Sequence, residues 1–127
     1  MTRHVSIAEQ IARSAMTFEE HRLGRKPTSV TVVIGGYSLV IAIHGVLSPA
    51  EQIRAAGPEG TVQFQQFHQW LFQLCSNPLR REIQRITGFE LRDTAKGTAA
   101  VKVFSGGTVI QLFLLAGRLP SDSWGGM

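Results

Sequence analysis

Two basic residues beside a glycine and a proline are the first feature of the sequence that could do chemistry. Residues 24–29 are Gly-Arg-Lys-Pro-Thr-Ser, in which Arg25 and Lys26 could together hold an anion. The stretch is only superficially like a phosphate-binding loop, because it lacks the G-x-x-x-x-G-K-[ST] spacing and precedes a predicted strand rather than a helix. Arg25 and Lys26 are therefore candidate anion-binding residues, and a plain helix-to-strand connector is the alternative.

Histidine, cysteine and acidic residues show no arrangement typical of catalysis or metal binding. The four histidines are far apart, without H-x-x-H or C-x-x-C spacing, so we predict neither a metal site nor a cofactor. His44 falls in a predicted strand and could face a groove; the alternative is a hydrogen-bonded structural histidine. Cys75, beside Leu71 and Leu74, is expected in the core. With no nucleophile motif and no carboxylate pair for acid–base chemistry, we predict that the chain is not an enzyme.

Composition indicates one globular domain. The 127 residues are 43% hydrophobic and 17% charged, which suits a packed core rather than disorder. We place the domain at residues 1–117 and expect the Gly-, Ser- and Pro-containing residues 118–127 to form a flexible tail. The net charge of +4 permits an anionic partner, but no nucleic-acid-binding motif is present, so nucleic acid is not expected. A single cysteine suits the reducing cytoplasm.

The apolar run from Val30 to Val46 is predicted to form a β-hairpin. Adjacent glycines at 35 and 36 can adopt the positive φ angles of a tight turn. Pairing about them places Ile34 beside Tyr37 and puts the apolar residues of both legs on one face: Val30, Val32, Ile34, Tyr37, Leu39, Ile41 and Ile43. The alternative is a membrane-inserted helix, but the run is shorter than the roughly 20 residues that a span requires.

Four helices are predicted from apolar spacing and capping residues. The first covers residues 5–23 with Ser6 as cap and Gly24 as stop, and the second covers 49–56 behind a capping box of Ser48, Pro49 and Glu51. Residues 57–60 are predicted to be a loop. The third helix covers 61–75, with Phe64, Phe67, Leu71 and Leu74 facing inward and Trp70 beside them, and the fourth covers 78–87 with Asn77 as its cap.

A second hairpin is predicted near the C-terminus. Strands at 99–104 and 109–115 would turn at Gly106-Gly107, with Val103 opposite Ile110, while Phe113 lies on the second, partly covered face. The predicted fold class is thus α+β, in the order helix, hairpin, helices, hairpin. Its four-stranded, mainly antiparallel sheet would have the helices packed on one face.

Several motifs together resemble the MpsC-type domain, a family named for a Na⁺-translocating membrane-potential-generating system. The resemblance rests on residues 21–30 (HRLGRKPTSV), 45–51 (GVLSPAE), the Pro78-Leu79 pair and 86–89 (ITGF), and it extends over roughly residues 8 to 115. Members typically show G-R-G-P-x-S/T-V and G-V-L-T-P-A-E, so Gly24, Pro27, Ser48, Pro49 and Glu51 are the motif residues here. Lys26 replaces the usual glycine, and Ser48 replaces the usual threonine.

The resemblance implies a small cytoplasmic protein, or one peripheral to the inner membrane face, associated with a membrane ion or bicarbonate transport system. We therefore predict a non-enzymatic accessory or interaction domain, forming a homodimer and docking on a membrane transport complex, without a transmembrane segment. The apolar second face of the last hairpin is the expected dimer surface. The alternative is a regulatory domain that binds a small ligand or anion between helices and sheet near Arg25 and His44. An enzyme of unassigned type is the weakest hypothesis.

Overall fold

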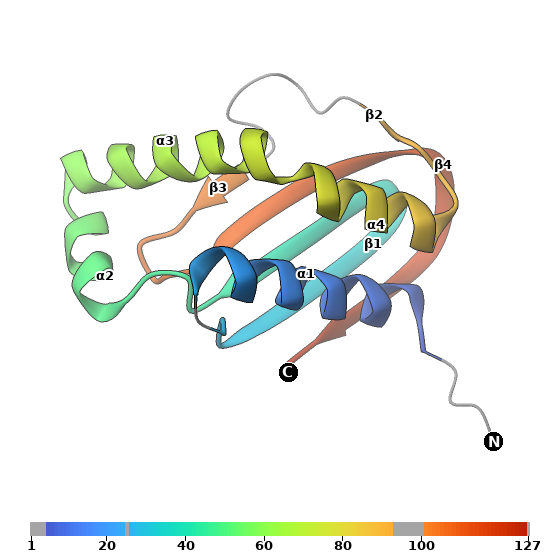
Figure 1. Ribbon diagram of the computed structural model, residues 1–127, viewed down its shortest axis with the longest axis horizontal. Coiled ribbons are helices and arrows are strands. Elements are labelled where there is room, and N and C mark those ends of the chain that lie inside the picture. The colour runs from blue at the N-terminus through green and yellow to red at the C-terminus, as the bar shows by residue number, and fades with distance from the viewer. Residues whose placement is uncertain (1–4, 25, 93–100, 127) are drawn as a thin grey trace.

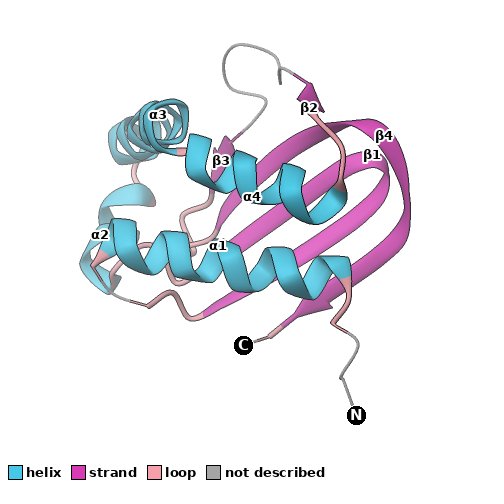
Figure 2. Cartoon of the chain, turned by 45° about the vertical axis from the view of Figure 1, so that its right-hand side comes forward, coloured by secondary structure: helices cyan, strands magenta, loops and turns pink. Residues whose placement is uncertain are grey.

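The computed structural model describes residues 5–24, 26–92 and 101–126. In these residues four helices lie on one face of a four-stranded antiparallel sheet, which confirms the predicted α+β class (Figure 1). None of the described helices lies on the other face of the sheet in either view (Figure 2). Among the described helices, none combines the length and the apolar character that crossing a bilayer requires.

Helix α1, Ile7–Leu23, begins and ends where its capping residues predict. The Ser6 hydroxyl accepts a hydrogen bond from the backbone N–H of Glu9 at 3.1 Å, which satisfies one of the free amides of the first turn. Gly24 ends the helix with φ 73°, a left-handed conformation that glycine adopts without steric cost. The inner face of α1 is fully buried through Ala8, Ile11, Ala12 and Ala15.

Strand β1, Ser29–His44, is one extended element that turns back on itself near its middle, as Figure 1 shows. Its ends lie side by side, because the N–H of Thr28 donates to the carbonyl of His44 at 2.9 Å. The reversal predicted at the two glycines is therefore present, and Gly36 has the positive φ, 59°. Ile34 is the last buried side chain before the bend and Leu39 is the first buried one after it, so the reversal is made by residues 35–38. Tyr37, predicted on the buried face, is consequently exposed.

Strand β4, Val109–Gly125, follows the same reversal on its outside. Gly36 and Ser38 are two residues apart on β1, but their partners Leu119 and Leu114 are five apart on β4. The extra residues give β4 the longer outer path around the bend, visible in Figure 1.

The prediction of a flexible tail at 118–127 was wrong for the residues described. Thr31 pairs with Gly125, and the side chain of Asp122 accepts a hydrogen bond from the N–H of Ala8 at 2.9 Å. Gly, Ser and Pro residues look loop-like in sequence, yet here they extend an edge strand, where proline is tolerated.

Helices α2, Pro49–Ala55, and α3, Pro58–Cys75, are separated by little more than Gly57. The predicted loop at 57–60 was wrong, because Pro58 opens α3 at a position that favours proline. Gly60 lies in the first turn of α3, so close to α2 that an added Cβ would stand 1.8 Å from the carbonyl oxygen of Arg54. The glycine that looked like a loop residue is thus required by close packing of two helices.

Helix α4, Asn77–Thr87, follows α3 directly. The predicted separation of two helices here is confirmed, with α4 beginning one residue before Pro78, and Gly88 ends the helix with φ 77°. The N-cap, however, is Ser76 and not Asn77, and no side-chain hydrogen bond caps this end. Ser76 has an α-helical conformation, so the chain passes from α3 into α4 without the extended residue that a capping asparagine needs.

The second hairpin is present with a register one residue away from the prediction. Strand β3, Val101–Val103, pairs with β4 so that Val103 faces Val109 and Lys102 faces Ile110. The turn contains three residues instead of two, closed by Phe104 and Thr108, with Gly107 at φ 95°. This one-residue shift in register exchanges the two faces of β4 relative to the prediction. Phe113 is fully buried in the core, while Ile110, Leu112 and Leu114 lie on the open face. Strand β2, Leu91–Arg92, pairs with the same edge of β4.

Candidate functional site

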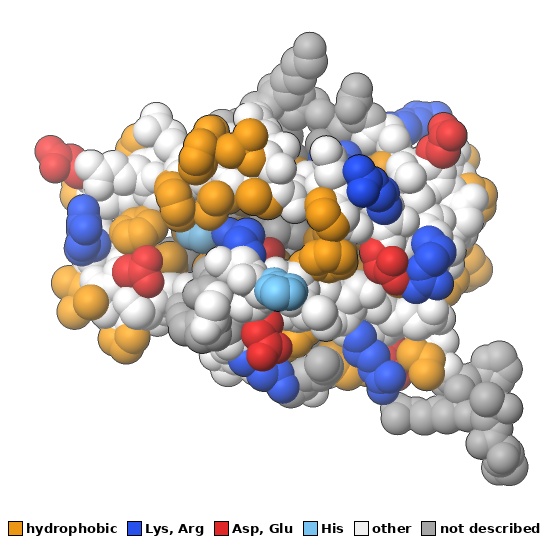
Figure 3. Space-filling model, viewed as in Figure 1, with side chains coloured by type: hydrophobic (Ala, Val, Ile, Leu, Met, Phe, Trp, Pro, Cys, Tyr) orange, Lys and Arg blue, Asp and Glu red, His pale blue; other side chains and the backbone are white. Residues whose placement is uncertain are grey.

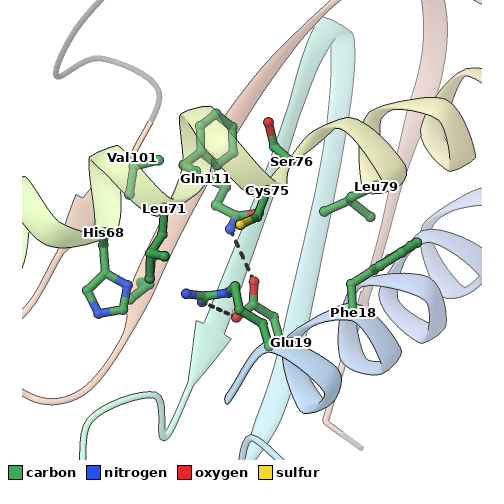
Figure 4. A pocket seen from close by; sticks show the side chains of 12 residues that line it. Phe18, Glu19, His68, Leu71, Cys75, Ser76, Leu79, Val101 and Gln111 are labelled. Carbon is green, nitrogen blue, oxygen red and sulfur yellow. Dashed lines mark hydrogen bonds and ion pairs between the residues drawn. The ribbon is translucent and has the colours of Figure 1, made fainter. Parts of the chain in front are cut away.

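A cavity of about 70 Å³ lies between α1, the end of α3, the start of α4 and the sheet (Figure 4). Apolar side chains form much of its wall, among them Phe18, Leu71, Phe72 and Leu79. Polar side chains also line it, and four of them come from three separate elements: Glu19, Arg22, His68 and Gln111. Figure 3 shows a histidine, a cation and an acidic side chain meeting in a hollow below α3. The tertiary fold therefore assembles a polar cluster inside a mostly apolar pocket.

Glu19 and Gln111 connect helix and strand at the cavity floor. Glu19 is only 4% exposed and forms an ion pair with Arg22, three residues further along α1. Its other carboxylate oxygen accepts a long hydrogen bond of 3.5 Å from Nε2 of Gln111 on β4. Oε1 of Gln111 is buried and has no hydrogen-bond partner among the described residues. A buried acceptor without a hydrogen bond lowers the stability of the folded chain, and such atoms are rare in folded proteins.

His68 on α3 is also buried, at the same pocket. The pKa of His68 is lowered from 6.5 to about 4, chiefly by burial and secondly by the nearby positive charge of Arg22, while the negative charge of Glu51 acts in the opposite direction. The imidazole is therefore neutral at pH 7. The two charged side chains of the lining, Glu19 and Arg22, form an ion pair and balance each other. Such a site favours a neutral polar ligand over an ion.

The sequence-predicted contact residues lie elsewhere. Arg25 lies outside the described residues, and the side chain of Lys26 is exposed. His44 bridges two threonines: Nε2 is 3.2 Å from Oγ1 of Thr31, and Nδ1 is 3.0 Å from Oγ1 of Thr108. Because Ile43 next to it is fully buried in the helix-side core, His44 faces the open side of the sheet. Its geometry is that of a hydrogen-bonded structural histidine, away from the cavity.

The family motif residues have structural roles. Gly24 ends α1, and Pro27 is buried. Ser48 and Glu51 form a complete capping box at α2: the Ser48 hydroxyl accepts from the N–H of Glu51 at 3.2 Å, and the Glu51 carboxylate accepts from the N–H of Ser48 at 3.0 Å. Pro49 occupies the first position of the helix. Glu51 also acts electrostatically on His68, which links this motif to the cavity.

The polar residues of the cavity do not stand out in the sequence. Helical periodicity puts Glu19 on the polar side of the first helix, and pairing about Gly106-Gly107 puts Gln111 opposite Lys102, so neither residue is marked as a site residue. One signal was available: Gln111 interrupts an otherwise apolar strand, Val109 to Leu115. Cys75, expected in the core, is instead exposed at the rim of the same cavity.

Helix α3 carries a second feature, an apolar surface that is not in the core. Phe67, Trp70 and Leu74, which we call the α3 strip, are 50%, 56% and 58% exposed. The prediction that Phe67 and Leu74 face inward was wrong, because His68 and Phe72 are the buried residues of this stretch. In Figure 3 a cluster of hydrophobic side chains is visible over α3.

Comparison with known proteins gives the family. The family described as the Na⁺-translocating membrane potential-generating system (MpsC) matches residues 3–106. The chain belongs to this family. Its MpsC membership supports, at the level of the family, a role in a membrane potential-generating system. The uncharacterized protein YbcI of Bacillus subtilis is 29% identical over 87 residues, which are 68% of this chain and 70% of YbcI. No solved structure shows a significant match.

Proposed function

We propose that this MpsC-family chain is a non-enzymatic accessory domain of a membrane potential-generating system, and that it binds a protein of that system through the α3 strip. The observation that carries the proposal is the exposure of Phe67, Trp70 and Leu74 on one side of α3. Contiguous exposed aromatic and aliphatic side chains are typical of interaction sites, and tryptophan is enriched among residues that dominate binding energy. The proposed location is the cytoplasm, at the inner face of the membrane.

The geometry of the strip suits a helix-binding groove on the partner. Its members are three and four residues apart, so they share one helix face, and the rings of Phe67 and Trp70 lie 6.4 Å apart. An apolar helix face of this spacing is a common element of helix-in-groove recognition.

A protein partner explains the strip better than a lipid surface does. Helices that lie in the membrane interface usually present Lys and Arg beside their apolar face. Between Pro58 and Cys75 there is no Lys or Arg, and glutamines flank the strip. The side chains next to the strip are therefore suited to hydrogen bonding with a protein rather than to contact with anionic headgroups.

Co-sedimentation with membranes tests the proposal. The purified chain is mixed with native vesicles from the source cells and, separately, with liposomes of the lipids extracted from them. We expect binding to the native vesicles only, lost in Trp70→Gln. Val62→Gln, which changes an exposed apolar residue elsewhere on α3, should bind as the wild type does. Equal binding to liposomes, or full binding by Trp70→Gln, would refute a protein partner at the strip.

We also propose that the chain forms a homodimer through the open face of the sheet. The pairs Val40–Leu112 and Ala42–Ile110 lie side by side on this face. The open-face positions of β1 from Thr31 to His44, and those of β4 from Ile110 to Leu114, carry neither Lys, Arg, Asp nor Glu. These positions give a second copy an uncharged surface to pack against, and the cations on the same face, Lys102 opposite Ile110 and Arg92 opposite Leu114, belong to the short strands β3 and β2 beside it.

Light scattering tests the homodimer. We expect a mass twice that of the chain for the wild type and the monomer mass for Leu112→Lys. Ser105→Lys, which adds the same charge at the exposed turn between β3 and β4, should remain dimeric. A monomeric wild type at micromolar concentration would refute the proposal.

A further inference from the structure

The imidazole of His68 is a buried polar group of the cavity that has no hydrogen bond. His68 is 5% exposed and lines the space, and neither of its ring nitrogens has a hydrogen bond to a described residue. Among the described side chains, Oε1 of Gln111 is the only nitrogen or oxygen atom that both lacks a hydrogen bond and is closed to solvent. The ring nitrogens of His68 can therefore be reached from the cavity.

The cavity has room for a small organic molecule. Its volume of about 70 Å³ is roughly half that of an apolar cavity known to hold benzene, which leaves space for about three to five non-hydrogen atoms. It is partly open to solvent, and Cys75 in its lining is exposed. Water alone suits the space poorly, because a buried water needs about three polar partners, and the side chains of Phe18, Leu71 and Leu79 offer none.

Arg22 supplies hydrogen-bond donors to the same space. Its hydrogen bond to Glu19 uses Nη2, so other N–H groups of the guanidinium remain for an acceptor in the cavity. In Figure 4 the imidazole of His68 comes from α3, whereas Glu19 comes from α1 on the other side of the space. Because Glu19 already balances the charge of Arg22, an added ion would have no counter-charge in this poorly hydrated site. The ligand is therefore neutral.

The charge of Arg22 also selects the form of His68. A neutral imidazole has one N–H, which donates, and one unprotonated nitrogen, which accepts. The cation favours the tautomer whose unprotonated nitrogen is the nearer one, because it attracts the lone pair and repels the N–H. A group that bridges the two side chains must then accept from Arg22 and donate to His68. A hydroxyl group does both with one oxygen, whereas a carbonyl oxygen only accepts.

We propose that the cavity binds a small neutral alcohol, whose hydroxyl group accepts a hydrogen bond from Arg22 and donates one to His68. The alkyl part, of about three carbons, packs against Phe18, Leu71 and Leu79. Neither the α3 strip nor the open face of the sheet lines this site, so it is independent of both proposed interfaces.

Propan-2-ol and acetone test the proposal, because they have nearly the same shape and only the alcohol donates an O–H. We expect propan-2-ol to shift the ring ¹⁵N signals of His68 and the methyl signals of Leu71, with saturation on the order of millimolar. Acetone should need a concentration about tenfold higher, because it leaves the accepting nitrogen of His68 without a donor.

A pair of matched variants tests the role of the imidazole. His68→Phe keeps an aromatic ring and removes both nitrogens, so the saturable shift of the Leu71 methyl signals should be lost. His21→Phe makes the same change at an exposed position and should retain the shift.

Three outcomes would overturn the proposal. The first is a linear, unsaturated response to propan-2-ol in the wild type. The second is saturation by acetone at the same concentration as by propan-2-ol. The third is undiminished binding of propan-2-ol by His68→Phe. The first two use the unmodified chain, so they decide the matter even if His68→Phe does not fold.

Discussion

The buried histidine of α3 should make folding stability depend on pH in a defined window. His68 has a pKa of about 4 in the folded chain, against 6.5 in an unfolded one, chiefly because burial removes its solvation and secondarily because of Arg22. Between these values the unfolded chain binds a proton that the folded chain does not. The free energy of unfolding therefore rises with pH through this window.

The size of the effect follows from the two pKa values. Each pH unit between 6.5 and 4 removes about 1.4 kcal/mol of stability, for a total of about 3 kcal/mol. The contribution is fully present above pH 6.5 and is lost as the pH falls toward 4. For a domain with an overall stability of about 5–15 kcal/mol, this loss is large enough to measure.

Urea unfolding of the wild type and His68→Gln at half-unit steps from pH 7.5 to 4 provides the assay. Subtracting the two curves removes the titration of carboxylates, which both chains share. We expect the difference in stability to fall by about 3 kcal/mol toward pH 4. A flat difference between the wild type and His68→Gln would refute the assignment of a buried neutral imidazole.

Three further predictions concern stability. Deleting residues 119–127 should lower the free energy of unfolding by several kcal/mol in denaturant titration, since burial of Leu119 alone is worth about 2 kcal/mol; an unchanged midpoint would show that this part of β4 contributes nothing. Ser48→Ala should lower the free energy of unfolding by about 1 kcal/mol, whereas Ser48→Thr should retain the cap. Equal melting temperatures for Ser48→Ala and the wild type would contradict the capping box. Gly60→Ala should lower the free energy of unfolding by about 1–3 kcal/mol in denaturant titration, because the added Cβ would meet the backbone of Arg54. Gly106→Ala, which adds a Cβ where space is open, is the control and should change the stability less.

Local rules were sufficient for both ends of α1, the start of α2 and the reversal of β1, although they misplaced the starts of α3 and α4. Ser6 and Gly24 mark the ends of α1, Ser48 and Glu51 the start of α2, and each works through hydrogen bonds or φ angles within one turn. The two glycines of β1 also predicted the chain reversal and the buried residues on both of its legs, because side chains alternate along a strand. The α+β class follows from these elements.

Residues whose environment depends on distant segments could not be placed from the sequence. The apolar periodicity of α3 shows that one face is apolar, but only packing decides that Phe72 and His68 meet the core while Trp70 stays outside. Likewise a one-residue change in the β3–β4 turn decides which side of β4 is buried, and so brings Gln111 to Glu19, 92 positions away in the sequence. The sequence by itself determined both ends of α1, the start of α2 and the reversal in β1, since those interactions span a few residues. The tertiary structure alone decided which polar groups lose their water, because desolvation depends on every element packed around them.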